Sequence, residues 1–259
     1  MDSHGGSKVA APLYQPRPVN LLPFAAGPPC RQSLKTTGAN VSNIAARARQ
    51  ILEQIPAHVT VVAVCKGRPT EEVLEAVGAG LHELGQNYMV DARRVAPAIT
   101  GIARMHLIGR LRPHDVRAAN LRLFDMVQSL DSLELAFRVD RVADAIGKRL
   151  PVLVEVNSAR ERQKSGVAPE AVEGLVRDVS RLPHLQVMGL MTMGPLLTDP
   201  QQYRPYFQET RWLFEHLRSA DVPGATMQHL SMGTSDSFEV AIEEGATMVR
   251  VGRALFGPR

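Results

Sequence analysis

The chain has 259 residues, 44% of them hydrophobic, and this length and apolar content suit a single (β/α)8 domain with a sizeable core. The net charge of +4 comes mainly from arginines spread along the sequence, with no basic run interleaved with aromatic residues, so a nucleic-acid partner is not expected. Cys30 and Cys65 form no CxxC pair, which argues against a disulfide framework or a zinc site. No apolar run approaches the roughly 20 residues that span a membrane. We therefore expect a cytoplasmic protein whose partner is a small, anionic molecule.

The first 38 residues form a segment of their own. Their prolines and glycines would interrupt any regular element, so we predict a flexible N-terminal extension over 1–38 and a folded domain over 39–259. The extension is poor in acidic residues and carries Lys8, Arg17, Arg31 and Lys35. That composition is also compatible with an organelle-targeting peptide.

Beyond the extension, eight short apolar runs alternate with stretches of helical spacing. The runs are 60–66, 82–84, 105–108, 126–129, 152–157, 186–192, 227–231 and 247–251. Strands that alternate with helices of this length predict right-handed βαβ units and a parallel sheet, and eight of them predict closure into a (β/α)8 TIM-like barrel. An open doubly wound sheet is the alternative, but no G-x-G-x-x-G follows the first strand to favour it.

Lys66 ends the first predicted strand. In such barrels the functional groups come from the carboxyl ends of the strands, so this amine should point into the barrel mouth. Burial disfavours the ammonium form, and a neutral amine can attack an aldehyde to form a Schiff base. A lysine that merely extends from the strand end into solvent is the alternative interpretation.

The seventh and eighth strand ends carry glycines and hydroxyls that suit an anion. The segment LSMGTSDS contains Ser231, Gly233 and Ser235, and Gly252 follows the eighth strand. A phosphate site after strands seven and eight is common in this fold. Ser235 or Asp236 could instead serve only as the N-cap of the next helix. An aldehyde-trapping lysine and a phosphate cup on one rim together meet the needs of pyridoxal 5'-phosphate.

These residues resemble a known family from about residue 39 to the end. The matching motifs, in order, are AVCKGRP, LGQNYMVDA, MHLIGRL, QKSGV, GLMTM and HLSMGTSDSFEVAIEEGATMVRVGRALFG. The chain is similar to the pyridoxal phosphate homeostasis proteins, single-domain relatives of the alanine racemase N-terminal barrel.

The resemblance implies roles for nine residues. Lys66 would hold the cofactor as a Schiff base. The phosphate would be bound by Ser231, Gly233, Ser235, Gly252 and the backbone of Arg253. Asn87 and Met191 would line the pocket, and Arg250 would face the pyridine nitrogen. An always protonated guanidinium there keeps that nitrogen unprotonated and restrains carbanion chemistry.

Several positions depart from the family pattern. Gln86 stands where a glutamate is usual, and residues 112–115 (RPHD) replace a Gln-x-Asn-Lys sequence. Thr234, Ser237 and Arg253 also differ from the common residues. None of these changes removes Lys66 or the glycines, but the segment 110–117 loses a basic residue.

Three functions compete. The first is intracellular cofactor homeostasis with little or no catalysis, by a monomer or weak dimer. The second is a pyridoxal phosphate-dependent amino-acid racemase. It would need a second base, which alanine racemases take from a C-terminal domain. Because the eighth predicted strand lies directly before Arg259, we expect no such domain to supply the base; Tyr88 is the one tyrosine near a predicted strand end. The third is a cofactor-free interaction module.

Two further residues are assigned structural roles. We expect His106 to be a core histidine whose ring is hydrogen-bonded, because no cluster with metal-ligand spacing accompanies it, and we predict no metal site. Strand alternation turns Cys65 away from Lys66, toward the helix layer.

Overall fold

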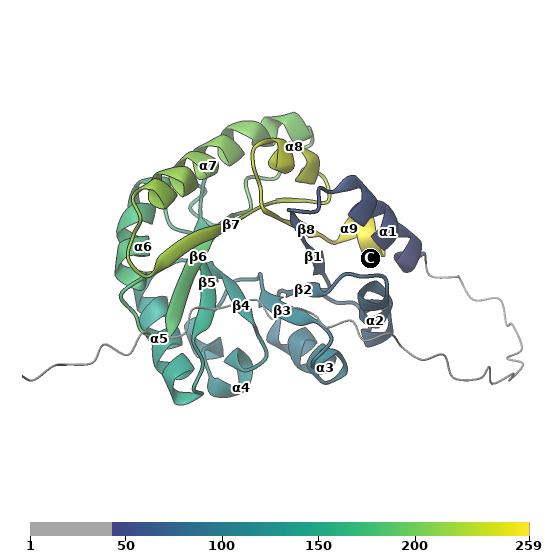
Figure 1. Ribbon diagram of the computed structural model, residues 1–259, viewed down its shortest axis with the longest axis horizontal. Helices are drawn as coiled ribbons and strands as arrows, with labels where there is room; N and C mark the ends of the chain where they lie inside the picture. Colours follow the sequence, from purple (N-terminus) through teal and green to yellow (C-terminus); the bar gives the residue numbers. More distant parts are fainter. Residues whose placement is uncertain (1–42, 259) are drawn as a thin grey trace, which may run out of the picture. The chain divides into compact units, whose positions relative to one another are not determined.

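The computed structural model describes residues 43–258, and the predicted extension 1–38 lies outside them. Eight parallel strands close into a barrel in sequential order, β1 to β8 (Figure 1). The strands are β1 Thr60–Val64, β2 Glu83–Gln86, β3 Arg104–Leu107, β4 Met126–Leu130, β5 Leu150–Val156, β6 Leu185–Thr192, β7 Ala225–Thr234 and β8 Met248–Val251. The closing pair is β1 with β8, where Val62 is in register with Arg250. The predicted (β/α)8 barrel is confirmed.

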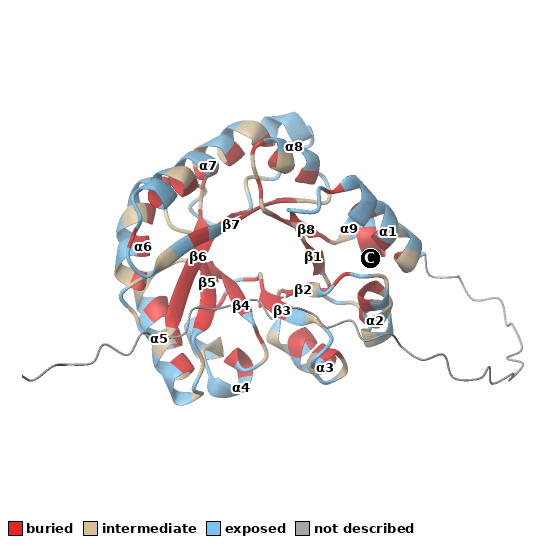
Figure 2. Cartoon of the chain, in the orientation of Figure 1, coloured by how far each residue is buried: buried red, intermediate tan, exposed pale blue. Residues whose placement is uncertain are grey.

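Helices surround the barrel on the outside (Figure 1). They are α1 Ile44–Gln54, α2 Thr70–Gly78, α3 Met89–Ile99, α4 Ala118–Leu121, α5 Leu133–Ala145, α6 Val172–Val179, α7 Arg204–Ser219, α8 Phe238–Glu243 and α9 Arg253–Phe256. Short 3-10 turns occupy Pro113–Asp115, Pro169–Ala171 and Pro200–Tyr203. Figure 2 shows the helices buried on the side that faces the strands and exposed on the other. Their apolar stripes therefore supply the outer core of the barrel.

The ends of β1 and β7, next to predicted site residues, differ from the sequence prediction. β1 stops at Val64, so Lys66 lies in the following loop, although the Cys65 amide still donates to the Gly85 carbonyl at 2.9 Å. β7 runs on to Thr234, three residues beyond the predicted run. Its register with β8 shifts between Ser231 and Thr234, and this irregularity lets the pairing continue through the expected glycine turn.

Apolar side chains form two separate clusters. The larger one lies between the strands and the helices and includes Cys65, as alternation predicted. The smaller one fills part of the barrel interior and consists of Val62, Met126, Leu153, Met188, Met191 and Met248. Buried polar side chains, such as those of His106, Gln128 and Arg250, also lie among the strands.

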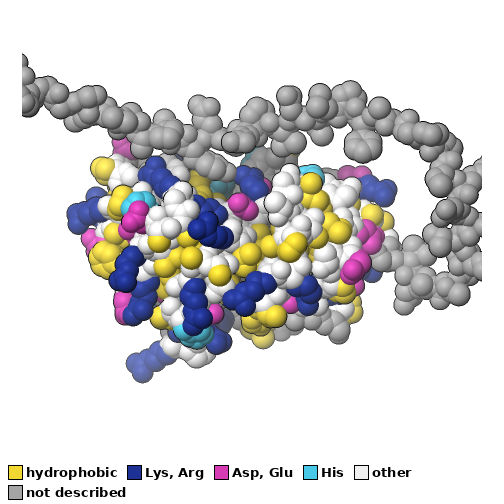
Figure 3. All heavy atoms as spheres, turned by 90° about the horizontal axis from the view of Figure 1, so that it is seen from below, with side chains coloured by type: hydrophobic (Ala, Val, Ile, Leu, Met, Phe, Trp, Pro, Cys, Tyr) yellow, Lys and Arg dark blue, Asp and Glu magenta, His cyan; other side chains and the backbone are white. Residues whose placement is uncertain are grey.

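Figure 3 shows the face that lies at the bottom of Figure 1. Lysine and arginine side chains are distributed over it between apolar and uncharged atoms. Within residues 43–258, no helix is both long enough and apolar enough to cross a membrane. The same residues contain no group of three or more histidine, cysteine, aspartate or glutamate side chains placed to hold a metal ion.

Candidate functional site

A cavity of about 850 Å³ is lined by residues from the carboxyl ends of the strands and from the loops that follow them. Its volume is in the range of small-molecule sites. Six of the residues predicted for the site line it: Lys66, Asn87, Ser235, Arg250, Gly252 and Arg253. All six sequence motifs contribute residues to this one concave surface.

The loop that carries Lys66 is fixed by backbone hydrogen bonds and by Asp91. The Gly67 amide donates to Asp91 Oδ2 at 2.8 Å, and the other carboxylate oxygen accepts from Arg94 at 2.7 Å. Arg94 also donates to the Arg68 carbonyl at 3.0 Å. An aspartate from α3 thus orients the β1–α2 loop, so that Lys66 lines the cavity.

Cys65 precedes Lys66 and is completely buried. Burial raises the pKa of its thiol to about 12. Its sulfur donates to the Ala63 carbonyl at 3.1 Å. The thiol is therefore protonated and inert at neutral pH, as a structural cysteine should be.

The β7 and β8 ends form a cup of amides and hydroxyls. Ser235 Oγ accepts from the amides of Gly252 and Ala254 at 3.1 and 3.2 Å. The N-cap of α8 is Ser237, not Ser235 or Asp236, so the alternative in which Ser235 only caps that helix does not describe the structure. The Arg253 guanidinium contacts Asp236 at the rim. The cup offers donors that an anion can share with Ser235.

Three predicted residues do not line the cavity. Gly233 lies within β7 at φ +89°, and a Cβ there would come within 2.5 Å of the Ala241 Cβ. The backbone path at this position therefore requires glycine. Ser231 is buried below the cup, where it contacts Arg250. Met191 belongs to the interior cluster, and Met193 lines the cavity in its place. Any phosphate role for Ser231 and Gly233 stays a prediction.

Arg250 lies at the base of the cavity and is only 2% exposed. One guanidinium nitrogen donates to Ser231 Oγ at 2.6 Å, and the other donates to the Thr192 carbonyl at 2.8 Å. Burial lowers the pKa of Arg250 to about 10, against the opposing charge of Glu155. The guanidinium therefore remains protonated at neutral pH.

Glu155 is a site residue that the sequence analysis missed. It lines the cavity from β5 and is 9% exposed. Burial, together with the nearby charge of Asp131, raises the pKa of its carboxyl to about 7, although Arg250 and Arg110 oppose the shift. The available signal was an acidic residue inside the otherwise apolar strand LPVLVEV, at an inward-facing position.

The Asn87 side chain indicates what kind of ligand the cavity suits. Its Oδ1 atom is buried and has no hydrogen-bond partner among residues 43–258. A buried acceptor without a partner is costly, and a donor on a bound ligand would satisfy it. Together with the amides of the cup and the protonated guanidinium below, it fits a phosphorylated, hydroxylated aromatic aldehyde.

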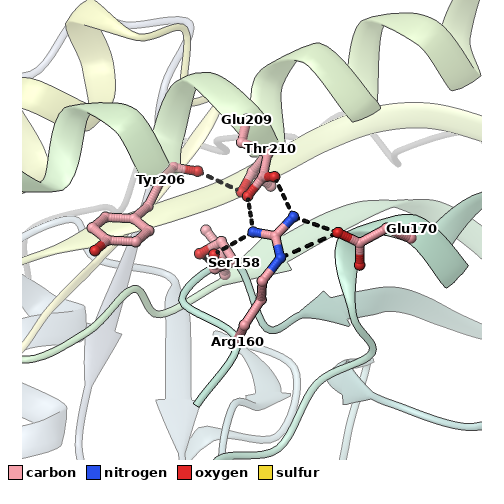
Figure 4. A network of polar contacts seen from close by, with 7 residues as sticks. Ser158, Arg160, Glu170, Tyr206, Glu209 and Thr210 are labelled. Carbon is pink, nitrogen blue, oxygen red and sulfur yellow. Dashed lines mark hydrogen bonds and ion pairs between the residues drawn. The ribbon is translucent and has the colours of Figure 1, made fainter.

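The side of the cavity opposite the cup is held by side-chain ion pairs. Arg160, with the left-handed φ of +54°, donates to Glu209 at 2.8 Å and to Glu170 at 2.5 Å (Figure 4). A further bond of 3.3 Å reaches the Ser158 carbonyl. This clamp ties the β5–α6 loop to α7, and the loop places Lys164 beside Gly194 of the β6 loop, at 3.0 Å.

The altered segment 110–117 touches the cavity only through Arg110 among its described residues. The 3-10 turn Pro113–Asp115 is held by local bonds, such as that from Asn120 Nδ2 to the Asp115 carbonyl at 2.8 Å. The substituted residues 112–115 therefore lie outside the cavity lining.

The tyrosine that reaches the cavity is Tyr203, whereas Tyr88 is 56% exposed and does not line it. The Tyr203 hydroxyl accepts from the Leu197 amide at 3.2 Å. His106 is buried and hydrogen-bonded through both ring nitrogens, as expected of a core histidine.

The fold and the cavity define a class: a (β/α)8 barrel with a lysine, an amide cup and a buried arginine at one rim. The family model described as alanine racemase, N-terminal domain, matches residues 39–259. A pyridoxal phosphate homeostasis protein of Aquifex aeolicus is 38% identical over 192 residues, covering 74% of this chain and 83% of the relative. Another, of Pseudomonas aeruginosa, is 34% identical over 230 residues, covering 87% and 97%.

Solved structures of related proteins have the same fold as this chain. PipY of Synechococcus elongatus, determined without and with pyridoxal phosphate, superposes with TM-scores of 0.78 and 0.75 at 30% identity, covering 83% of this chain and all of that one. An alanine racemase of Clostridium difficile shares the fold at a TM-score of 0.69 and 16% identity, over 60% of its length. The chain belongs to the alanine racemase N-terminal domain family and, within it, to the pyridoxal phosphate homeostasis proteins.

Proposed function

We propose that the protein binds pyridoxal 5'-phosphate in this cavity, covalently through Lys66, and acts in intracellular cofactor homeostasis with little or no catalysis. The observation that carries the proposal is the convergence of Lys66, the Ser235–Gly252 cup and Arg250 on one cavity. The family supports the same ligand, because a relative has been solved with pyridoxal phosphate bound. We further propose a cytoplasmic monomer or weak dimer.

Each group has a task in holding this ligand. The Lys66 amine would condense with the aldehyde carbon, with the carbonyl oxygen leaving as water, while the amides of Gly252 and Ala254 with the Ser235 hydroxyl would hold the phosphate. Asn87 Oδ1 accepts a hydrogen bond from a donor on the ligand. When bound, pyridoxal phosphate supplies an aldehyde and an electron-withdrawing ring.

Arg250 limits that chemistry. A guanidinium that stays protonated donates to the pyridine nitrogen and leaves it without a proton of its own, which weakens the ring as an electron sink. The Tyr203 hydroxyl is engaged by the Leu197 backbone, which does not favour a role as second base. These features support a carrier rather than a racemase.

The test is the absorbance spectrum of the purified protein with added cofactor, followed by borohydride reduction and peptide mapping. We expect a yellow protein whose reduced adduct maps to Lys66 and disappears in Lys66→Ala. Lys148→Arg is the matched control, because burial lowers the pKa of the Lys148 amine and makes it a competing nucleophile away from the cavity. A colourless protein that takes up no cofactor would contradict the proposal and favour an interaction module.

A racemase would be recognised by sustained D-alanine formation that requires Lys66. We expect none above the level seen with Lys66→Ala, measured by chiral chromatography after long incubation with L-alanine and cofactor.

A further inference from the structure

A chain of four hydrogen bonds runs through the barrel interior from the base of the cavity to β2. Arg250 Nη1 contacts Ser231 Oγ at 2.6 Å, and Ser231 Oγ contacts Gln128 Oε1 at 2.8 Å. Gln128 Nε2 contacts His106 Nδ1 at 2.8 Å, and His106 Nε2 contacts Glu83 Oε2 at 2.8 Å. Five strands, β8, β7, β4, β3 and β2, each contribute one side chain.

The direction of the chain follows from the chemistry of its two ends. A guanidinium has no acceptor, so Arg250 donates and the Ser231 oxygen accepts. The Ser231 hydroxyl is then free to donate to Gln128 Oε1, which turns the Gln128 amide nitrogen toward His106. That nitrogen donates, so His106 Nδ1 carries no proton, and the Nε2 proton points at the Glu83 carboxylate. Every group has one consistent role.

The surroundings leave the chain few alternatives. Gln128 and Ser231 are completely buried, and His106 is 3% exposed. Among residues 43–258, the Gln128 amide nitrogen also contacts the Met248 sulfur at 3.1 Å, a weak acceptor from the interior cluster. Because no solvent competes at this depth, an amide at position 128 that lost a partner would stay unsatisfied.

Gln128 lies outside the cavity lining, yet it determines which way the Ser231 hydroxyl points. With that hydroxyl directed at Gln128, the Ser231 lone pairs face Arg250 and hold Nη1, one of its two terminal guanidinium nitrogens. The second nitrogen is held by the Thr192 carbonyl. Two acceptors from two strands thus fix the plane of the guanidinium.

We propose that Gln128 is a positioning residue for Arg250, acting through Ser231, and that His106 and Glu83 lock the amide of Gln128 in the required orientation. The inference rests on the proposed function, because it concerns how Arg250 meets the bound cofactor. It predicts that the cofactor senses a residue that it does not touch.

The first test compares Gln128→Leu with Met126→Leu, a matched change on the same strand in the apolar part of the interior. Cofactor affinity is measured by titration and the ring environment by the absorption bands of the complex. We expect Gln128→Leu to bind about tenfold more weakly, equivalent to about 1.4 kcal/mol, and to shift the balance of the bands. Met126→Leu should leave both unchanged. Equal spectra and affinities in wild type and Gln128→Leu would overturn the proposal while leaving the proposed function intact.

A double-mutant cycle distinguishes coupling through the hydrogen bonds from independent packing effects of the two residues. If Gln128 acts through Ser231, then Gln128→Leu combined with Ser231→Ala loses about as much affinity as the larger single change, whereas independent effects would multiply. If the affinity losses of the two single changes instead multiply in the double variant, Gln128 does not act through Ser231.

The cofactor-free protein provides a readout that needs no ligand. Nitrogen-15 NMR should show His106 with its proton on Nε2, the resonance being assigned by its loss in His106→Gln. Gln128→Glu keeps the size of the side chain but places an acceptor opposite Nδ1, so Nδ1 should gain a proton. A wild-type proton on Nδ1 would reverse the inferred direction and overturn the proposal. A wild-type protein that binds no cofactor would instead contradict the proposed function.

Discussion

The two sides of the cavity are built in different ways. On the β7–β8 side the cup consists of backbone amides and one hydroxyl, held by a backbone path that Gly233 permits at φ +89°. On the β5–β6 side they are charged side chains, with Glu155 buried at the base and Arg160 clamping the loop above. One side of the cavity therefore depends on backbone geometry and the other on side-chain charge, so the two sides should respond to different perturbations.

The largest expected effect on stability comes from a substitution on the β7–β8 side of the cavity. Gly233→Ala places a Cβ 2.5 Å from the Ala241 Cβ in a left-handed conformation. Strain and overpacking together should lower the free energy of unfolding by about 3–4 kcal/mol and weaken cofactor binding. Urea unfolding measures the first and cofactor titration the second.

The matched control is Gly174→Ala in α6, where nothing lies within 4 Å of the new methyl group. It should stabilise the protein by about 0.5–1 kcal/mol because alanine is the better helix former. A Gly233→Ala protein as stable as Gly174→Ala would remove the argument for a backbone-determined cup.

The next effect lies on the charged side and depends on pH. The folded-state pKa of Glu155 is about 7, above its ordinary value of 4.5. Its contribution to stability is therefore fully present below pH 4.5 and is lost as the pH rises through about 7. Glu155→Gln should match wild type near pH 4 and be more stable than wild type by about 2–3 kcal/mol at pH 9.

Chemical denaturation of both proteins at a series of pH values checks this prediction. A Glu155→Gln difference that does not grow with pH would show that the carboxyl is already ionised in the folded protein. Gly233→Ala should show no comparable dependence on pH, which sharpens the contrast between the two sides.

The smallest effect concerns the clamp. Arg160→Met removes the ion pairs to Glu170 and Glu209, all of them solvent-exposed in part. Exposed ion pairs contribute little to global stability, so unfolding should change only slightly. The β5–α6 loop should nevertheless exchange its amide hydrogens faster, and cofactor binding should weaken by about two- to threefold.

Arg177→Met, which removes an exposed i,i+4 pair with Glu173 on α6, is the matched control. Its loop exchange and cofactor affinity should equal those of wild type. If Arg160→Met behaved in the same way, the clamp would have no part in shaping the site.

A register shift in β6 explains why Met193 lines the cavity while the predicted Met191 does not. Met188 and Met191 both point into the barrel, although residues three apart on a regular strand face opposite sides. The register of β6 shifts on both neighbours near Gly189, where a Cβ would come within 1.8 Å of the His229 carbonyl oxygen. The shift moves Met191 into the interior and leaves Met193 at the rim.

The sequence by itself determined the barrel, the order of its elements, and the positions of Lys66, Ser235 and Gly252 at one rim, whereas Arg250 was assigned from the family resemblance. These follow from local signals: apolar runs of strand length, glycines where backbone must turn, and the rule that parallel strands end on the same edge. Tertiary structure alone decided that Glu155 and Tyr203 line the cavity, that Met193 replaces Met191, and that Ser231 joins an interior chain with Gln128 and His106. Those outcomes depend on bulges and on contacts between strands distant in sequence, whose geometry is fixed only when the barrel closes.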